Sequence, residues 1–389
     1  MDFAPEETHL ALQGMANDFA RQEIFPVSGE IDLQKDPEGR FPADLLEKGS
    51  RLGLRTLAVP ESAGGGGADL LTLCFVGEEL GWGDLGVGVA LAQDWSVSCA
   101  LNAICDEAGL AEFYGGFVAN HGAHLTRAEF ASDPSFESRM PYSGIEEGPP
   151  AAVVREGEGW RLSGFAAHVM NGAAARHVLL SFGAPGDSGD SGGRQAFLVD
   201  GPASGGLRVA QVFDPMGMRA CQDVSLVCED LRVPGKSRIP CEPGGWERAI
   251  PAFCALPASA ALGAARRSNE HATVHARERV QGGKPIVEHQ TVGFMLCDNL
   301  MELDAARRAL HASAWEAGRA KPPDLRQSYL MKVFVSEACE RIARRSMEVW
   351  GGAGYMTEAP MERFVRDMTS FMHAGEMMSS LRARAMRMI

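Results

Sequence analysis

The stretch VWGGAGYMTEAPMERFVRD, from Val349 to Asp367, separates two segments of helical pattern near the end of the chain. Residues 329–350 form an amphipathic run, and this run stops at Gly351 and Gly352. Paired glycines are typical of a turn that ends a helix, because glycine adopts backbone conformations that other residues avoid. A long helical run closed by such a short turn favours a helical bundle for the last third of the chain.

The segments upstream of this bundle show helical and strand-like patterns of apolar residues. Apolar residues recur every three to four positions between 292 and 303, which extends the bundle pattern backward. From about residue 122, short runs such as HVLLSF and QAFLVDG alternate with glycine, aspartate and proline, and this pattern predicts a small antiparallel β domain. In the first third, Leu12, Met15 and Phe19 fall at helical spacing. The sequence therefore predicts an α+β fold, with helices in residues 1–121, strands in 122–236 and helices in 237–389.

Composition limits the possible partners and the compartment. The 389 residues carry a net charge of -14, which argues against nucleic acid or an anionic membrane as the main partner. The nine cysteines form no CxxC pair, so we expect reduced cysteines, no metal site and a cytoplasmic protein. The start of the chain is acidic and no uninterrupted apolar run is long enough to span a bilayer, so we expect neither export nor membrane insertion.

Four local strings, in order, resemble those of the acyl-CoA dehydrogenase family of flavoenzymes. They are HLTRAEFASD (His124 to Asp133), GMRACQDVSLVCEDLRVP (Gly217 to Pro234), RERVQGGKPIVEHQ (Arg277 to Gln290) and the stretch from Val349 to Asp367. The resemblance covers nearly the whole chain. It implies an N-terminal helical domain, a β-barrel-like middle domain and a C-terminal four-helix bundle.

The resemblance also implies FAD as the cofactor. The matching cofactor-binding residues are Thr126, Ser132, Met170, Arg279, Gln290, Gly351 and Gly352. Glycines at a helix end let backbone N–H groups approach a pyrophosphate, and an arginine supplies a fixed cationic fork for the same group. In the family, the bundle residues hold the flavin of a neighbouring subunit. We therefore expect a homotetramer, or a heterotetramer with a related subunit.

The implied reaction is the α,β-dehydrogenation of an acyl-CoA thioester to a 2-enoyl-CoA, with an electron-transfer flavoprotein or a similar protein as the electron acceptor. Several positions depart from the family pattern. Arg127 replaces a glutamate, Gly282 a phenylalanine, Glu348 a glutamine and Met377 a threonine. Extra residues from Pro134 to Pro150 are expected to form a loop near the acyl pocket.

The position of the catalytic base is the main departure. Aligning the chain on Arg366 upstream and Arg382 downstream places the family's glutamate column on Gly375, and the only nearby acid, Glu376, comes one residue later. One residue of helix is a rotation of about 100°. Some relatives carry the base on a bundle helix instead, and that column falls on Phe253, beside Cys254.

Three interpretations stay open from the sequence. In the first, Glu376 is the base after a local shift, His373 assists, and the backbone N–H of Gly375 binds the thioester carbonyl. In the second, the protein runs a reaction of the desulfinase type, without net oxidation and without this base. In the third, the chain is a non-catalytic subunit that lends Arg279, Gln290 and the two glycines to a partner's flavin.

Overall fold

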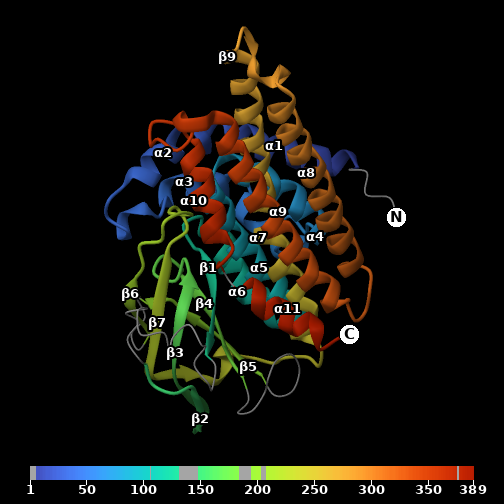
Figure 1. The fold of residues 1–389 in the computed structure, drawn as a ribbon. Coiled ribbons are helices and arrows are strands. Elements are labelled where there is room, and N and C mark those ends of the chain that lie inside the picture. The colour runs from blue at the N-terminus through green and yellow to red at the C-terminus, as the bar shows by residue number, and fades with distance from the viewer. Residues whose placement is uncertain (1–5, 106, 131–147, 184–193, 203–206, 375) are drawn as a thin grey trace.

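The computed structural model describes residues 6–105, 107–130, 148–183, 194–202, 207–374 and 376–389. Helices come first and last along the chain and strands lie between them, as Figure 1 shows. The α+β fold class predicted from the sequence is confirmed. The first group of helices is α1 (Glu7–Phe19), α2 (Phe25–Leu33), α3 (Ala43–Arg51), α4 (Leu70–Gly83), α5 (Leu85–Ile104) and α6 (Glu107–Ala119).

The strands of the middle region form two four-stranded sheets. The first sheet has the order β1 (Leu125–Phe130), β4 (His177–Phe182), β5 (Gln195–Asp200) and β8 (Arg238–Ile239); the second has β2 (Ala152–Glu156), β3 (Gly159–Met170), β7 (Asp223–Pro234) and β6 (Leu207–Val212). The pairings within these sheets are antiparallel except that of β1 with β4, which is parallel. The expected antiparallel pattern fails at that pair because the chain passes through β2 and β3 of the other sheet before it returns.

The first sheet is covered on both faces. Side chains from both sheets, such as Phe130 and Leu226, form one buried cluster between them. The opposite face of the first sheet, with Leu125 and Leu179, packs on α5 and α6. This arrangement fixes β1 between helices and the second sheet.

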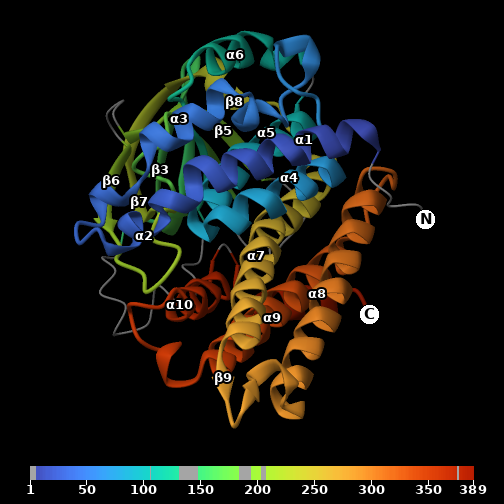
Figure 2. The same cartoon turned by 90° about the horizontal axis from the view of Figure 1, so that it is seen from above.

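The last group of helices is α7 (Gly245–Glu278), α8 (Gln290–Ala317), α9 (Leu325–Trp350), α10 (Met361–Phe371) and α11 (Met378–Met386). A short hairpin, β9 (Val280–Gln281) and β10 (Lys284–Pro285), joins α7 to α8. Figure 2 shows α7 between the first group of helices and the pair α8 and α9. In length and composition α7 could cross a membrane, but 83% of its most apolar window is buried inside the protein, as in the core helix of a globular fold.

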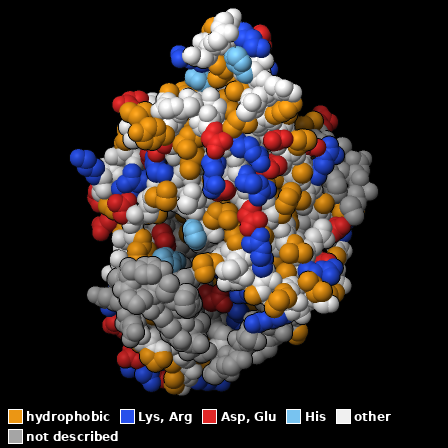
Figure 3. All heavy atoms as spheres, in the orientation of Figure 1, with side chains coloured by type: hydrophobic (Ala, Val, Ile, Leu, Met, Phe, Trp, Pro, Cys, Tyr) orange, Lys and Arg blue, Asp and Glu red, His pale blue; other side chains and the backbone are white. Residues whose placement is uncertain are grey.

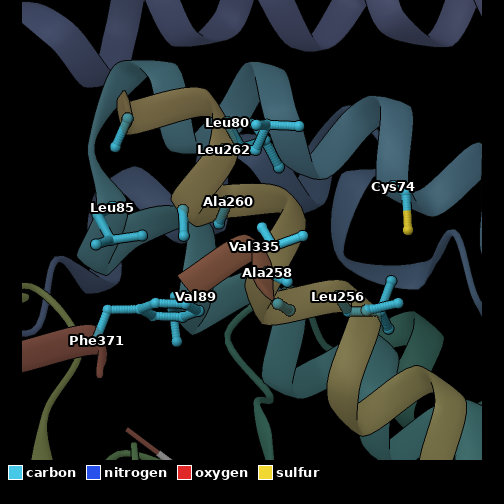
Figure 4. Close-up of a cluster of buried hydrophobic side chains, with 14 of the residues drawn as sticks. Cys74, Leu80, Leu85, Val89, Leu256, Ala258, Ala260, Leu262, Val335 and Phe371 are labelled. Atoms are coloured by element: carbon cyan, nitrogen blue, oxygen red, sulfur yellow. The ribbon is translucent and has the colours of Figure 1, made fainter. Parts of the chain in front are cut away.

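The largest core lies where α4, α5, α7 and α9 meet (Figure 4). Its contacts are unusually close because glycines face the crossing of α4 with α7. A Cβ atom on Gly81 would lie 2.0 Å from the carbonyl oxygen of Ala260, and one on Gly263 would lie 1.8 Å from that of Glu78. Only glycine fits at these two positions without a shift of the backbone.

Replacing Gly263 with alanine should therefore lower the free energy of unfolding by about 1 to 3 kcal/mol, because an added methyl group in a filled core forces its neighbours to move. Urea unfolding followed by circular dichroism measures the change. The matched control is Gly115→Ala on the exposed face of α6, where nothing lies within 4 Å of the added Cβ. That control should be neutral or stabilise the protein by up to about 1 kcal/mol. Equal effects at both positions would contradict the close crossing.

Candidate active site

A cavity of about 260 Å³ lies where the strands meet both groups of helices. Its lining residues come from α5 (Gln93, Ser96), β1 (Arg127, Glu129), β3 (Ala166, Ala167, His168, Met170), the position just before β5 (Arg194), α7 (Trp246, Ile250, Phe253, Cys254, Pro257), α9 (Tyr329, Lys332) and the region near the C-terminus (Ala374, Glu376, Leu381, Arg384). Figure 3 shows a hollow in the lower half of this face in which acidic and basic side chains are visible. The cavity therefore combines an apolar wall from α7 with several charged groups.

The strand that carries part of this wall is anchored by a buried carboxylate. Asp94 of α5 is fully buried and accepts hydrogen bonds from the backbone N–H of Leu125 at 2.6 Å and from Nδ1 of His124 at 2.9 Å. Both partners stand at the start of β1. Asp94 thus sets the position from which β1 presents its next residues to the cavity.

Two of the residues expected to bind the cofactor meet at the end of β3. The hydroxyl of Thr126 donates to the backbone carbonyl of Met170 at 2.5 Å, and Thr126 is fully buried. The Met170 side chain lines the cavity, with its sulfur 3.8 Å from Nε2 of Gln93. The structure therefore places these two residues side by side at one wall.

Charged residues of β1 form part of the same wall. Arg194 donates to Glu129 at 2.7 Å, and the nearest guanidinium nitrogen of Arg127 lies 3.9 Å from the same carboxylate. Burial alone would raise the pKa of Glu129, but the charges of Arg194 and Arg127 outweigh it and hold this pKa below its ordinary value. The Arg127 guanidinium also lies 4.2 Å from the ring centre of Phe253. Arg127, which departs from the family pattern, is thus held by an acid and an aromatic ring.

Glu376 lines the cavity and pairs with Arg384 of α11 at 2.7 Å. Phe253 and Cys254, which mark the other column considered for the base, line the same cavity. Burial raises the pKa of Cys254 to about 12, so its thiol stays protonated at neutral pH. Among the residues at these three positions, only Glu376 carries a carboxylate. His373, by contrast, is exposed and faces a different pocket.

The other expected cofactor residues gather elsewhere. Arg279 and Gln290 are exposed near the β9 hairpin, and Gly351 and Gly352 are exposed just after α9. The ends of α7 and α9 are packed together there, with the rings of His275 and Trp350 stacked at 4.2 Å. None of the four lines the cavity. Figure 1 shows the β9 hairpin at the top of the bundle and α11 in its lower half.

Helix α9 connects the cavity to the second group of expected cofactor residues, so its length gives the distance between them. Lys332 lies at the cavity and Gly351 follows the end of the same helix. At the rise of an α-helix, the residues between them span about 28 Å. One chain therefore presents two separate parts of the expected cofactor site.

Two of the residues expected at the site, Ser132 and Gly375, lie outside the described residues, as do residues 134–147 of the extra segment. Two departures from the family pattern have local explanations. Gly282 has a φ of 64° and forms the hairpin turn with Gly283, which also has a positive φ. Met377 is the N-cap of α11.

Sequence reasoning missed several residues of the cavity, above all Lys332, Arg384 and Arg194. Lys332 is 4% exposed, and burial lowers its pKa to about 7. One signal was present: Lys332 lies three residues after Tyr329 and seven before Cys339, on the stripe that the helical period buries. A lysine on an apolar stripe indicates a special environment. Arg384 and Arg194 carry no such signal, because their partners are distant in the sequence or in another element.

The comparisons with known proteins cover most of the chain. The model of the acyl-CoA dehydrogenase N-terminal domain matches residues 6–118, and that of the C-terminal domain matches residues 247–375. The mitochondrial short-chain specific acyl-CoA dehydrogenase of Bos taurus is 31% identical over 376 residues, covering 93% of this chain and 85% of the relative. The probable acyl-CoA dehydrogenase YngJ of Bacillus subtilis (strain 168) is 28% identical over 381 residues, covering 97% and 96%.

A solved structure shows the same fold. Butyryl-CoA dehydrogenase from Megasphaera elsdenii superimposes with a TM-score of 0.86 at 23% identity, covering 100% of this chain and 99% of that chain. At this identity the likeness concerns the fold alone.

The anchor of β1 gives a testable prediction. Replacing Asp94 with alanine leaves two buried donors without their acceptor, and each should cost about 1 to 3 kcal/mol of unfolding free energy. The replacement Asp94→Asn keeps one acceptor oxygen and should cost less. Urea unfolding measures both, and Asp304→Ala, which removes an exposed acid paired with Arg308, is the control. A loss for Asp94→Ala no larger than the control's would contradict the anchor.

Proposed function

The chain belongs to the acyl-CoA dehydrogenase family, and we propose that it dehydrogenates its acyl-CoA thioester in the cavity of Glu376, with that glutamate as the base. It is an oxidoreductase that acts on CH–CH groups and converts the thioester to a 2-enoyl-CoA. Its cofactor is FAD. The observation that carries the proposed role is the position of the Glu376 side chain in the wall of the cavity, although its place in the sequence is one residue late.

The chemistry assigns different tasks to different groups. When bound, FAD supplies the acceptor for the hydride that leaves the β carbon. Glu376 takes the α proton, and its carboxylate becomes a carboxylic acid in that step. Arg384 holds the carboxylate through the ion pair at 2.7 Å, so the base is oriented before the substrate arrives. The apolar wall with Phe253 and Cys254 keeps water from the acyl chain.

The residues present fit an FAD. Gly351 has a φ of 60°, is exposed, and has nothing within 4 Å of the position where a Cβ would stand, so its backbone is open to a phosphate. Arg279 is exposed, and the hydrogen bond found for its side chain within the described residues is a long one of 3.3 Å to Gln281. Its guanidinium can therefore turn toward a pyrophosphate.

The separation of the two groups of residues supports an oligomer. Thr126 and Met170 would hold the flavin of their own subunit, whereas Arg279, Gln290 and the paired glycines would hold that of a neighbour. The separation of about 28 Å along α9 supports this division. A tetramer, either of one chain or with a related chain, is the proposed assembly, and an electron-transfer flavoprotein or similar protein is the proposed acceptor. The proposed location is the cytoplasm, from composition.

The two alternatives to dehydrogenation receive no support from the comparisons. A desulfinase-type reaction and a non-catalytic subunit were considered because Gly375 occupies the usual base column. Glu376 supplies a carboxylate in the same cavity. The direct test is to purify the protein, record its flavin spectrum and add a panel of acyl-CoAs with an artificial electron acceptor. A flavin-containing protein that oxidises none of them, alone or with a related subunit, would overturn the proposed function.

The role of Glu376 is tested by Glu376→Gln. The loss of a positioned general base should lower kcat by about 10²- to 10⁴-fold, while the FAD content and the binding of acyl-CoA stay unchanged. Stopped-flow reduction of the flavin measures the step. The control is Glu337→Gln, which removes another carboxylate paired with an arginine of α11 but outside the cavity.

Full activity of Glu376→Gln would show that another group is the base. In that case Gly375→Glu, which restores the usual column, should raise the rate, and this pair of results would overturn the role of Glu376 as the base.

The role of Arg279 is tested by measuring how tightly the protein binds FAD. Arg279→Ala removes a charge-assisted contact to the pyrophosphate and should raise the dissociation constant of FAD by about 10-fold or more. Equilibrium dialysis measures the affinity. Arg308→Ala removes another exposed arginine, paired only locally with Asp304, and should leave the affinity unchanged. Equal affinities for both variants would mean that Arg279 does not contact the cofactor.

A further inference from the structure

Lys332 is a buried lysine at the cavity, and the described residues offer no hydrogen-bond acceptor to its amine. Its side chain comes from α9, is 4% exposed, and lines the cavity that also contains Glu376. In the described part of the chain, no hydrogen-bond partner is found for its amine nitrogen. The amine lies over the ring of Phe371, 3.4 Å from the ring centre.

The surroundings of the Lys332 amine provide neither a negative charge nor a strong hydrogen-bond acceptor for it. The groups that act on it most, Cys254 of α7 and Cys339 of α9, are thiols whose pKa burial raises to about 12, so neither supplies a negative charge at neutral pH. Phe371 of α10 offers only the face of its ring. The two acids of the cavity wall, Glu129 and Glu376, are paired with Arg194 and Arg384. The protonated amine carries three N–H donors, and a buried donor without an acceptor is rare in folded proteins.

The balance of charges in the cavity also favours an anionic ligand. Its described lining residues include three arginines and one lysine, Arg127, Arg194, Arg384 and Lys332, against two carboxylates, Glu129 and Glu376. Arg194 and Arg384 pair with these two carboxylates. His168 also lines the cavity and pairs with Asp223. The cavity thus keeps an excess of positive charge inside a protein whose net charge is -14. Such a field favours an anionic ligand.

We propose that Lys332 binds a carboxylate at the distal end of the acyl chain, so that the substrates are CoA thioesters of dicarboxylic acids. This inference rests on the proposed function, because it assigns the acyl chain to the cavity of Glu376. The carboxylate supplies the acceptor that the amine lacks, and the buried charges form a pair. Cys254 lines the same cavity and interacts electrostatically with both Glu376 and Lys332, so we assign it to the wall along which the acyl chain lies.

The test compares matched acyl-CoAs in the holoenzyme. Glutaryl-CoA is compared with valeryl-CoA, and adipyl-CoA with hexanoyl-CoA, so that each pair differs by the carboxylate at equal chain length. In the wild type, kcat/KM should favour the dicarboxylic member by about 10- to 100-fold, the factor that a hydrogen bond to a charged group provides. In Lys332→Met this preference should vanish or reverse, because a chain of similar length replaces the amine by an apolar group. The control Lys236→Met, at an exposed lysine in the turn after β7, should keep the wild-type preference.

Calorimetry gives a readout that a merely structural role would not move. Because burial holds the pKa of Lys332 at about 7, most of the amine is neutral at about pH 8. A bound carboxylate favours the charged form and raises this pKa, so binding of glutaryl-CoA at that pH should take up close to one proton per site. Valeryl-CoA should take up none, and Lys332→Met should abolish the uptake with glutaryl-CoA.

The outcomes separate this inference from the proposed function. Equal or better use of the monocarboxylic members by the wild type would overturn it, as would an equal loss on both members in Lys332→Met, which would indicate a general catalytic or structural role. A protein that binds glutaryl-CoA with proton uptake but oxidises no acyl-CoA would keep the inference and overturn the proposed function. A protein that oxidises monocarboxylic acyl-CoAs best would keep the proposed function and overturn the inference.

Discussion

The close crossing of α7 with α4 is the constraint on which the rest of the molecule depends. Gly81 and Gly263 let the two backbones approach to a distance that no other residue permits. Helix α7 thereby becomes the common wall of the N-terminal helices and the C-terminal bundle, and it runs on past the β domain. Phe253 and Cys254 lie on this helix and face the cavity. The shape of the candidate site is therefore set by a packing contact that involves neither substrate nor cofactor.

A second set of contacts brings distant strings of the sequence together. The backbone N–H of Met218 donates to Asp367 at 2.6 Å, and Arg366 donates to the carbonyl of Met216 at 2.7 Å. Arg366 also makes a two-bonded ion pair with Asp32 of α2. These contacts join the β domain, the first helices and α10 at one point. Two of the strings that carry the family resemblance thus meet in space, because each supplies what the other needs: a carboxylate for a buried N–H and an arginine for a free carbonyl.

The sequence predicted the order of helices and strands because the apolar period changes from helical to alternating and back. It gave no period for α5, whose residues Leu85–Ile104 are almost all buried, so no polar face marks the helix. Thr126 and Met170 were found through the family resemblance, and the structure puts them in contact. The cluster of charges was not predictable, because Arg194, Glu129 and Arg384 come from elements whose approach depends on the tertiary fold. The offset of Glu376 was visible as a mismatch in the sequence, but its place in the cavity needed coordinates.

Helix α9 connects the two parts of the proposed site. Lys332 stands at the cavity near its beginning, and Gly351 stands at its end, so a single rigid helix fixes the distance between them. In the proposed assembly, a flavin held by Thr126 and Met170 of one chain is completed by the paired glycines of a neighbouring chain. The functional unit is then the proposed oligomer, in which each helix presents one end to its own substrate and the other to the cofactor of a neighbour. The lysine at the first end would select the acyl chain, and the glycines at the second would complete the neighbouring site.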